Sequence, residues 1–457
     1  MENVDISQMI DALISVLHEN GALKSAAVEQ AFRNVPRHLF LPNEPLERAY
    51  QDIAITVKES EEGVSTSASS QPTIMAAMLE QLELQPGMRV LEIGAGTGYN
   101  AALMAYLVGE TGSVVTVDIQ PDLIEQARAN LDCAGFERVQ ATAADGGEGY
   151  PPAAPYDRII LTASSWVIPP AWREQLKDGG RIVLPLSLAQ RHDSKIELKM
   201  KDGKRIVFPV SLNEPQKSIA FDRRGEELIS GSIWDCGFMP LQGVFAAPPP
   251  LQIPTGPGDG LVLTSLQPLP VDEPTFSHWL AARGEAYPTG VKVIVWELLT
   301  DFLTWLTVRS PDGSANLSAV GDAVDDILSL ALIAFKGQEK RVETFLKILP
   351  SSAAAMTRPP EAETNWYNIE QPEENTPEQP FEVYVRQLGP NPEAAQLLVR
   401  LIQEWDAAER PNASRLRLRG IPAGKPRQMP GNLPGQMPEG EYLIERPWTN
   451  FIVWYQD

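Results

Sequence analysis

The sequence predicts an α/β protein whose first half folds as a doubly wound parallel sheet with helices on both faces. From residue 86 onward, short apolar segments of strand length alternate with segments that have helical apolar spacing. This alternation is typical of parallel sheets, whose buried strands are joined by crossover helices. A glycine-rich run at 94–98 connects the first strand to the first helix, as the tight first turn of such a sheet requires.

Each element of the predicted sheet follows from local signals. The strands are short runs rich in Val, Ile and Leu, and Gly109 closes the first helix. The turn dipeptide Asp202-Gly203 predicts an antiparallel hairpin at one edge, over Ile196–Pro209. In order, we predict strand Arg89–Ile93, helix Tyr99–Val108, strand Ser113–Val117, helix Pro121–Ala134, strand Val139–Ala143, strand Arg158–Leu161, helix Pro170–Leu176 and strand Arg181–Leu184.

An amino-terminal helical cap is predicted before the sheet, within residues 1–85. Apolar residues recur at helical spacing over residues 5–20, and Gly21 offers a stop. A second helix is expected from Ser25, as its cap, to Arg33. The prolines that follow, such as Pro36, then break the helical pattern.

The length of 457 residues predicts more than one domain. We expect a core at 86–245, a linker at the proline- and glycine-rich stretch 246–260, and an α+β extension at 261–457. Within the extension the predicted helices are Trp296–Trp305, Ala319–Phe335 and Pro392–Ala408, with an acidic, proline-rich loop over 357–379.

The amino-acid composition limits the kinds of partner and site that the protein can have. The formal net charge of -22 repels nucleic-acid phosphates and anionic membranes, so we expect neither as a partner. The two cysteines, Cys133 and Cys236, are too few for a disulfide framework or a metal site. With no apolar run of about 18 residues, the chain is expected to lie in the cytoplasm without a membrane span.

The run Glu92-Ile93-Gly94-Ala95-Gly96-Thr97-Gly98-Tyr99 carries the first functional signal. Its spacing is G-x-G-x-G rather than the G-x-G-x-x-G of dinucleotide sites, and an acid directly precedes it. This variant favours S-adenosylmethionine over a nicotinamide dinucleotide. The alternative is that the glycines only form a strand-to-helix turn.

Two more acids follow successive strands. Asp118 comes about twenty residues after the glycines, where an acid can accept both hydroxyls of a ribose. Asp145, followed by Gly146, is placed to accept from an adenine amino group. The alternatives are a helix cap before Pro121 for Asp118 and a turn residue for Asp145. Three acids at the ends of three strands favour the nucleoside site.

The segment Ser65-Thr66-Ser67-Ala68-Ser69-Ser70-Gln71-Pro72 precedes a predicted helix, with Ser70 expected as its N-cap. A helix amino terminus with a hydroxyl beside it binds anions, which suits an acceptor carboxylate. A capped helix after a loop is the alternative interpretation.

Several motifs together resemble the protein-L-isoaspartate O-methyltransferase family over roughly the first 243 residues. They are Val35-Pro36-Arg37-His38-Leu39-Phe40-Leu41-Pro42, Ala49-Tyr50-Gln51-Asp52, Ser70-Gln71-Pro72-Thr73-Ile74-Met75, the glycine run, Val183-Leu184-Pro185 and Phe238-Met239-Pro240-Leu241.

This resemblance implies a class I methyltransferase fold, Rossmann-like, that uses S-adenosyl-L-methionine. By position it implies that Ser70 and Asp52 act at the active site and that Ser69, Ser70 and Gln71 bind the substrate. The implied cofactor shell is Glu92, Gly94, Ala95, Gly96, Gly98, Tyr99, Asp118, Asp145 and Gly146. No catalytic base is assigned, because a carboxylate acceptor is already ionised at neutral pH.

Two departures from the family pattern bear on the substrate. The segment Ser67-Ala68-Ser69 differs from the glycine, hydroxyl and apolar pattern of many members, which leaves the choice between aspartate and isoaspartate open. The extra half is similar to that of longer relatives found with lanthipeptides, graspetides and lasso peptides, which methylate one aspartate and drive succinimide (aspartimide) formation. We therefore predict a carboxyl O-methyltransferase acting on a dedicated ribosomal peptide.

Other functions stay open at this point. The main alternative is general repair of isoaspartyl protein, and a small-molecule O-methyltransferase or a non-catalytic binding module is less consistent with the intact motifs. In the extension, one basic and one aromatic group are compatible with peptide recognition, although a solvated loop and core packing explain them equally well. They comprise Arg410, Arg415, Arg417, Arg419, Lys425 and Arg427, and Tyr442, Trp448, Phe451, Trp454 and Tyr455.

Overall fold

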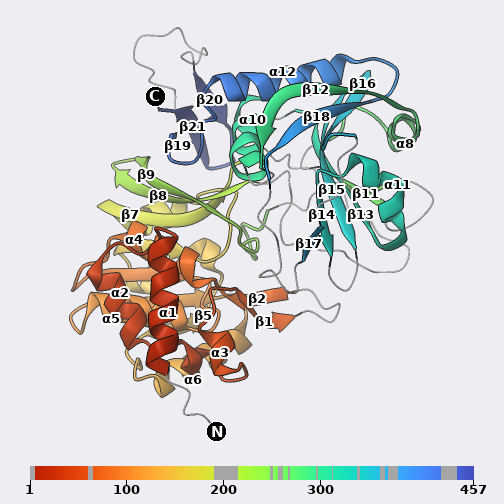
Figure 1. Cartoon of the computed structure of the whole chain (residues 1–457). Helices are drawn as coiled ribbons and strands as arrows, with labels where there is room; N and C mark the ends of the chain where they lie inside the picture. The colour runs from red at the N-terminus through yellow and green to blue at the C-terminus, as the bar shows by residue number, and fades with distance from the viewer. Residues whose placement is uncertain are drawn as a thin grey trace.

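A computed structural model gives the architecture of the chain (Figure 1). It describes residues 6–59, 65–189, 215–247, 251–255, 261–265, 268–294, 297–310, 312–336, 340–360, 366–368, 379–423 and 440–456. In this part of the chain, no helix is both long enough and apolar enough to span a membrane.

The amino-terminal cap contains the two predicted helices, followed by two short helical turns. Helix α1 (Ile6–Glu19) ends before Gly21, and α2 (Ala26–Asn34) begins after Ser25, whose Oγ accepts a hydrogen bond from the Val28 N–H at 3.3 Å. That bond satisfies a backbone donor of the first helical turn and confirms the predicted cap. The short turns are η1 (Arg37–Phe40) and α3 (Leu46–Ala49), and a hairpin of β1 (Ile55–Glu59) and β2 (Ser65–Ser69) follows.

Five parallel strands form one half of the large sheet, in the order β5-β4-β3-β6-β7, with β5 at the edge. The predicted doubly wound sheet is confirmed. Its strands are β3 (Arg89–Ile93), β4 (Ser113–Asp118), β5 (Gln140–Ala143), β6 (Tyr156–Leu161) and β7 (Leu176–Ser187). The connecting helices are α4 (Pro72–Leu82), α5 (Tyr99–Val108), α6 (Pro121–Cys133) and α7 (Pro170–Gln175), with short turns η2 (Gly146–Glu148) and η3 (Pro151–Ala153).

Antiparallel strands extend this sheet beyond β7. First come β8 (Gln216–Arg224) and β9 (Glu227–Cys236), and then three strands from the end of the chain: β19 (Leu416–Pro422), β21 (Thr449–Tyr455) and β20 (Glu441–Ile444). Strand β19 pairs with β9, with Arg419 opposite Ile229. The last strands of the predicted extension therefore belong to the large sheet. The predicted hairpin Ile196–Pro209 lies outside the described residues.

A second, largely antiparallel sheet fills the rest of the extension, in the order β10-β11-β13-β15-β16-β18-β12, with β14 paired to β15 and β17 paired to β14. Its strands are β10 (Leu251–Pro254), β11 (Leu261–Ser265), β12 (Arg283–Val293), β13 (Ser314–Val320), β14 (Ile333–Lys336), β15 (Arg341–Leu349), β16 (Ser352–Thr357), β17 (Trp366–Asn368) and β18 (Phe381–Leu388). The helical elements are α8 (Glu273–Ala281), η4 (Leu298–Phe302), α10 (Leu303–Arg309), η5 (Gly321–Ala323), α11 (Val324–Ile327), η6 (Leu328–Leu330) and α12 (Glu393–Ala407).

Predictions for the extension are right only in part. Helix α12 confirms the helix expected at 392–408, and η4 with α10 covers most of the one expected at 296–305. The helix expected at 319–335 is wrong, because that stretch contains the end of β13, three short helical turns and β14. Residues 333–335 of this stretch pair with β15, so sheet pairing decided its end.

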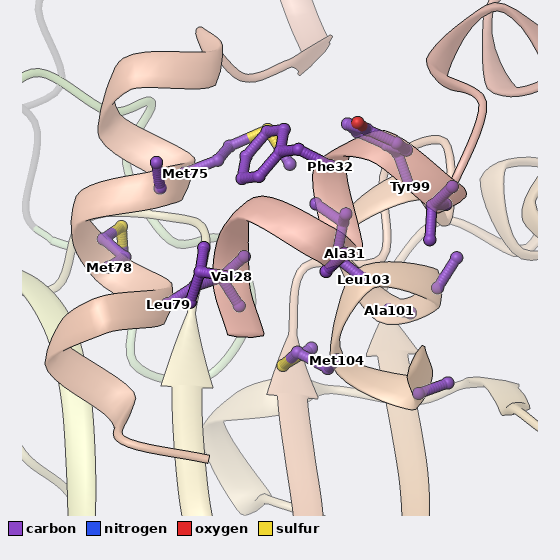
Figure 2. Close-up of a cluster of buried hydrophobic side chains, with 14 of the residues drawn as sticks. Val28, Ala31, Phe32, Met75, Met78, Leu79, Tyr99, Ala101, Leu103 and Met104 are labelled. Carbon is purple, nitrogen blue, oxygen red and sulfur yellow. The ribbon is translucent and has the colours of Figure 1, made fainter. Parts of the chain in front are cut away.

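The cap packs against one face of the large sheet and joins its core. Alternate residues of β3 point to opposite faces: Val90 joins the cluster under the cap, and Leu91 joins the cluster beneath α7. Figure 2 shows side chains of α2, including Phe32, between those of α4 and α5. The Phe32 ring meets the Tyr99 ring edge-on at 6.3 Å, and both are at most 2% exposed. The cap thus fixes the start of α5, where the glycine turn ends.

We expect Phe32→Ala to destabilise the protein by about 3–5 kcal/mol, the usual cost of removing a buried aromatic ring. Urea unfolding measures the loss. Val16→Ala on the exposed side of α1 is the control and should change stability by less than about 0.5 kcal/mol. Equal unfolding midpoints for the two variants would contradict this packing.

Candidate active site

The glycine turn after β3 has a backbone that only glycine adopts without strain. Gly94, Gly96 and Gly98 have φ values of 103°, 48° and 85°. A Cβ at Gly94 would lie 2.3 Å from Thr162 Oγ1, and that hydroxyl donates a hydrogen bond to the Gly94 carbonyl at 2.6 Å. Gly94 therefore permits the close approach of Thr162, and Gly94 and Gly96 both line a pocket at the end of β3.

Glu92 is fully buried directly before this turn. Its Oε1 accepts a hydrogen bond from Asn100 Nδ2 at 2.7 Å, and its Oε2 accepts one from Thr116 Oγ1 at 2.6 Å. Burial raises the pKa of Glu92 to about 7, because removal from water disfavours the charged form more than these two donors favour it. A cation nearby would favour the carboxylate.

Asp118 lies at the end of β4, beside the glycine turn. Its carboxylate accepts hydrogen bonds from the Gly96 N–H at 3.3 Å and the Gln120 N–H at 3.1 Å. Burial raises its pKa above the ordinary value, and the backbone donors partly oppose that effect. Asp118 therefore lies directly beside the glycine turn and lines the same pocket as Gly96.

Two adjoining pockets surround the turn and share Ala68, Gly94, Gly96 and Thr162. The first also has Ser69, Ser70, Met75, Met78, Glu92, Ala95, Thr97, Tyr99, Asn100, Ile160 and Phe238 in its lining. The second adds Thr66, Ser67, Ile93, Val117, Asp118, Ile119, Gln120, Leu123, Gly146, Ala163, Met239, Pro240, Leu241 and Gln242. Seven of the predicted cofactor residues are thus brought together: Glu92, Gly94, Ala95, Gly96, Tyr99, Asp118 and Gly146.

Asp145 and Gly98 do not line these pockets. The Asp145 carboxylate accepts hydrogen bonds from the Gly147 N–H at 2.9 Å and the Val244 N–H at 2.8 Å. It holds its own turn and the segment after β9, and contact with an adenine amino group stays a prediction. Gly98 instead lies against α6, where a Cβ would be 3.2 Å from the Ala127 carbonyl oxygen.

The predicted N-cap role of Ser70 is wrong. Helix α4 begins at Pro72, whose ring fixes the first helical φ, so Ser70 lies one residue before the cap position of Gln71. Asp52, which lies in a distant segment, accepts hydrogen bonds from the first turn of α4 in place of Ser70. Its carboxylate accepts from the Thr73 N–H at 2.8 Å, the Thr73 hydroxyl at 2.7 Å and Gln71 Nε2 at 2.9 Å.

Sequence reasoning missed the role of Arg37. This fully buried guanidinium donates hydrogen bonds to the carbonyl oxygens of Ala49, Gln51 and Ile53, and also to that of Ser70, at 3.0 to 3.2 Å. Burial lowers its pKa. Arg37 therefore joins the segment that carries Asp52 to the segment that carries Ser70. An arginine inside an otherwise apolar run was the available signal.

Sequence reasoning also missed the pocket wall after β9. Residues 239–242 line the second pocket, although the sequence marked 239–241 only as part of a family motif. The nearby β1–β2 hairpin contributes Thr66 and Ser67 to the same pocket. An ion pair of 2.5 Å between Lys58 and Asp122 docks this hairpin on the start of α6.

Comparison with known proteins decides the family. Residues 8–199 match the family model described as protein-L-isoaspartate(D-aspartate) O-methyltransferase. A protein-L-isoaspartate O-methyltransferase of Ignicoccus hospitalis is 43% identical over 174 residues, which are 38% of this chain and 80% of the relative. The chain belongs to the protein-L-isoaspartate O-methyltransferase family. A Pyrococcus horikoshii relative of the same name is 36% identical over 44% of this chain and 91% of its own.

Two solved structures are also similar. One, named protein-L-isoaspartate O-methyltransferase, is 23% identical and covers 90% of this chain and 96% of its own, with a TM-score of 0.44. The other, a putative protein-L-isoaspartate O-methyltransferase from Plasmodium falciparum in complex with S-adenosyl-L-homocysteine, is 17% identical and covers 50% of this chain and 97% of its own, with a TM-score of 0.40.

Family membership confirms the predicted enzyme class and cofactor. The protein is a carboxyl O-methyltransferase of the protein-L-isoaspartate type, and S-adenosylmethionine is its cofactor. The residues described above fit that molecule, since the glycine turn leaves room for a ligand next to the buried Glu92 carboxyl group.

Glu92 predicts a pH dependence of stability. Its folded pKa of about 7 lies above the ordinary 4.5, so the folded protein holds this proton more tightly than the unfolded chain does. The stability due to the proton is complete below about pH 4.5 and is lost as the pH rises through about 7. Glu92→Gln should abolish this loss, which urea unfolding at pH 5 and pH 8 measures.

Glu110→Gln is the matched control, because Glu110 is exposed and not in the pocket. It should keep the wild-type slope of stability against pH. If Glu92→Gln kept that slope as well, Glu92 would not be the titrating group.

Proposed function

We propose that this enzyme methylates an aspartate or isoaspartate carboxylate in one dedicated ribosomal peptide and promotes succinimide formation. The observation that carries the proposal is the position of residues 68–70, which we call the acceptor segment because we assign the acceptor carboxylate to it. Ala68, Ser69 and Ser70 line the same pocket as the glycine turn, and a Cβ at Gly96 would lie 3.6 Å from the Ala68 carbonyl oxygen. A carboxylate bound at this segment would adjoin the methyl donor.

Residue roles follow from these positions. We assign the cofactor to Glu92, the glycine turn and Asp118, with Ala95, Tyr99 and Gly146 beside them. The acceptor carboxylate is assigned to Ser69 and Ser70, with Gln71 at the helix start. Asp52 is assigned to the active site as a positioning residue, because its three hydrogen bonds fix the start of α4. Asp145 is assigned to the adenine side through the turn that holds Gly146.

The chemistry needs orientation rather than a base. S-adenosylmethionine supplies an electrophilic methyl group. A carboxylate is already ionised at neutral pH, so Ser70 has only to hold one of its oxygens in line for attack. The Ser70 carbonyl is itself held by Arg37 at 3.0 Å, which keeps the hydroxyl-bearing segment in place.

Succinimide formation follows from the methyl ester. The nitrogen of the next backbone amide attacks the ester carbonyl carbon and forms the new C–N bond. The bond to the methoxy oxygen breaks, and methanol leaves with the proton from that nitrogen. The ester is required because methoxide is a much better leaving group than the oxide of a free carboxylate.

The extension supports a dedicated substrate. The sequence matches to the two relatives described above cover 38% and 44% of this chain, so more than half of it lies outside those matches. We propose a cap at 1–85, a core at 86–245, a linker at 246–260 that also contributes β10 to the second sheet, and a peptide-recognition extension at 261–457. Strands β19–β21 of that extension also complete the catalytic sheet.

General repair of isoaspartyl protein is the second candidate function. It is favoured by the names of the relatives, which are protein-L-isoaspartate O-methyltransferases. The intact glycine turn and its acids weigh against a non-catalytic binding module. We also place the enzyme in the cytoplasm, because Cys133 and Cys236 are both free thiols.

Substrate breadth tests the proposal. The enzyme should not methylate unrelated isoaspartyl or aspartyl model peptides, and should methylate a peptide encoded beside its gene. Mass spectrometry would record the ester and then loss of methanol to the succinimide. Efficient methylation of every isoaspartyl peptide would instead establish general repair.

Replacement of Ser70 tests its assigned role. Ser70→Ala should lower kcat/KM for methyl transfer about 10- to 100-fold, the usual effect of losing one hydrogen bond to a charged group. The affinity for S-adenosylhomocysteine, measured by calorimetry, should stay the same. Ser25→Ala, which removes the distant α2 cap, should reduce stability and leave methyl transfer unchanged. Loss of cofactor affinity in Ser70→Ala would refute the assignment.

A further inference from the structure

One wall of the cofactor pocket is made from two segments that bond to each other. Thr162 and Ala163, after β6, line the pocket together with residues 239–242. The Ser164 N–H donates to the Met239 carbonyl at 2.8 Å, and the Leu241 N–H donates to the Ser164 carbonyl at 2.8 Å. Because the bonds run in both directions, the two segments hold one another in register. Neither segment is part of a central strand. Ser165 ties the first segment to β7, because its N–H donates to the Pro185 carbonyl and its carbonyl accepts from the Ser187 N–H, both at 2.8 Å. The wall also depends on what supports it from behind.

The turn between β20 and β21 supports this wall from the far end of the chain. Arg446 is 5% exposed, and its Nε donates to the Trp166 carbonyl at 2.7 Å. Its Nη2 donates to the Ala189 carbonyl at 2.5 Å, after β7. Thr449, which is 1% exposed, donates through Oγ1 to the Ile168 carbonyl at 2.8 Å. Buried carbonyl oxygens without partners are costly, so these donors stabilise the path of residues 166–168.

The same turn also reaches the second segment of the wall. The Trp448 ring meets the Phe245 ring edge-on, with 4.7 Å between centroids. Phe245 follows the pocket residues closely, and its carbonyl accepts a hydrogen bond from Trp166 Nε1 at 3.2 Å. The neighbouring Val244 N–H is the donor to Asp145. Trp448 thus contacts Phe245, which adjoins the hydrogen bond between Val244 and Asp145. That bond joins the segment after β9 to the turn after β5.

We propose that the β20–β21 turn is an integral support of the cofactor pocket and that Arg446, Trp448 and Thr449 are positioning residues for S-adenosylmethionine. The inference rests on the cofactor site of the proposed function, and it is independent of the peptide substrate. It gives the end of the extension a role in binding the methyl donor. An enzyme truncated before β19 would lose that support along with three strands of its sheet.

The test uses the full-length enzyme and S-adenosylhomocysteine in calorimetry. Trp448→Ala should weaken binding about tenfold, within the range of couplings between neighbouring sites, and Trp448→Phe should restore most of the affinity. In methyl transfer, KM for S-adenosylmethionine should rise while kcat at saturation stays near wild type. A purely stabilising residue would not change KM in the folded enzyme.

Phe451→Ala is the matched control. Phe451 is buried in the same hairpin, but its ring lies 6.1 Å from Phe221 on β8, away from the pocket wall. Phe451→Ala should lower the melting temperature. The affinity for S-adenosylhomocysteine should stay within about twofold of wild type, because this position is not coupled to the cofactor pocket. If Trp448→Ala does not fold, Thr449→Val, which removes the bond to Ile168 and keeps the shape, should weaken binding instead.

Two failures are distinguishable. If the wild-type enzyme binds S-adenosylhomocysteine and the folded turn variants bind equally well, the support role is refuted and the cofactor site stands. If the wild-type enzyme itself does not bind, the cofactor site of the proposed function is refuted.

Discussion

The acceptor side of the site depends on one buried guanidinium. Arg37 donates to carbonyl oxygens at 49–53 and to that of Ser70, so it fixes two loop segments that no sheet holds in place. Its burial is costly in itself, and the cost is offset only while those acceptors stay in position. The Tyr99 ring lies 6.0 Å from the guanidinium, which links this cluster to the first residue of α5 and to the glycine turn. The cap, the acceptor segment and the glycine turn are therefore positioned together.

The other side of the pocket is held from the end of the chain. Parallel strands bring Glu92 and Asp118 to one edge of the sheet, as the topology requires. The opposite wall, at 162–163 and 239–242, is joined to the sheet through Ser165 and β7. The residues that continue this wall, at 166–168 and 245, contact the β20–β21 turn. The catalytic sheet continues through β9 into β19, so the extension shares the sheet and core of the enzyme it follows. Recognition of a peptide by the extension would thus occur on a body continuous with the methyl-donor pocket.

The sequence was most informative where local signals and fold agree. The elements from β3 to β7 were predictable because apolar runs, glycine stops and proline starts mark each one, and the glycines required positive φ values that the structure has. The N-cap of α4 was not, because Asp52 reaches it from twenty-one residues earlier along the chain. Arg37 and the 239–242 wall also depend on contacts between distant segments. In the extension, pairing of β14 with β15 turned the end of a predicted helix into a strand.

The most direct test of carboxyl methylation is the fate of a deuterated methyl group. The enzyme would be incubated with S-adenosylmethionine labelled at the methyl position and with its peptide substrate, and tandem mass spectrometry would locate the label. We expect the label on the carboxyl oxygen of one aspartyl or isoaspartyl residue, and we expect it to be lost as methanol when the succinimide forms. A label on nitrogen, on a hydroxyl group or on carbon would contradict it.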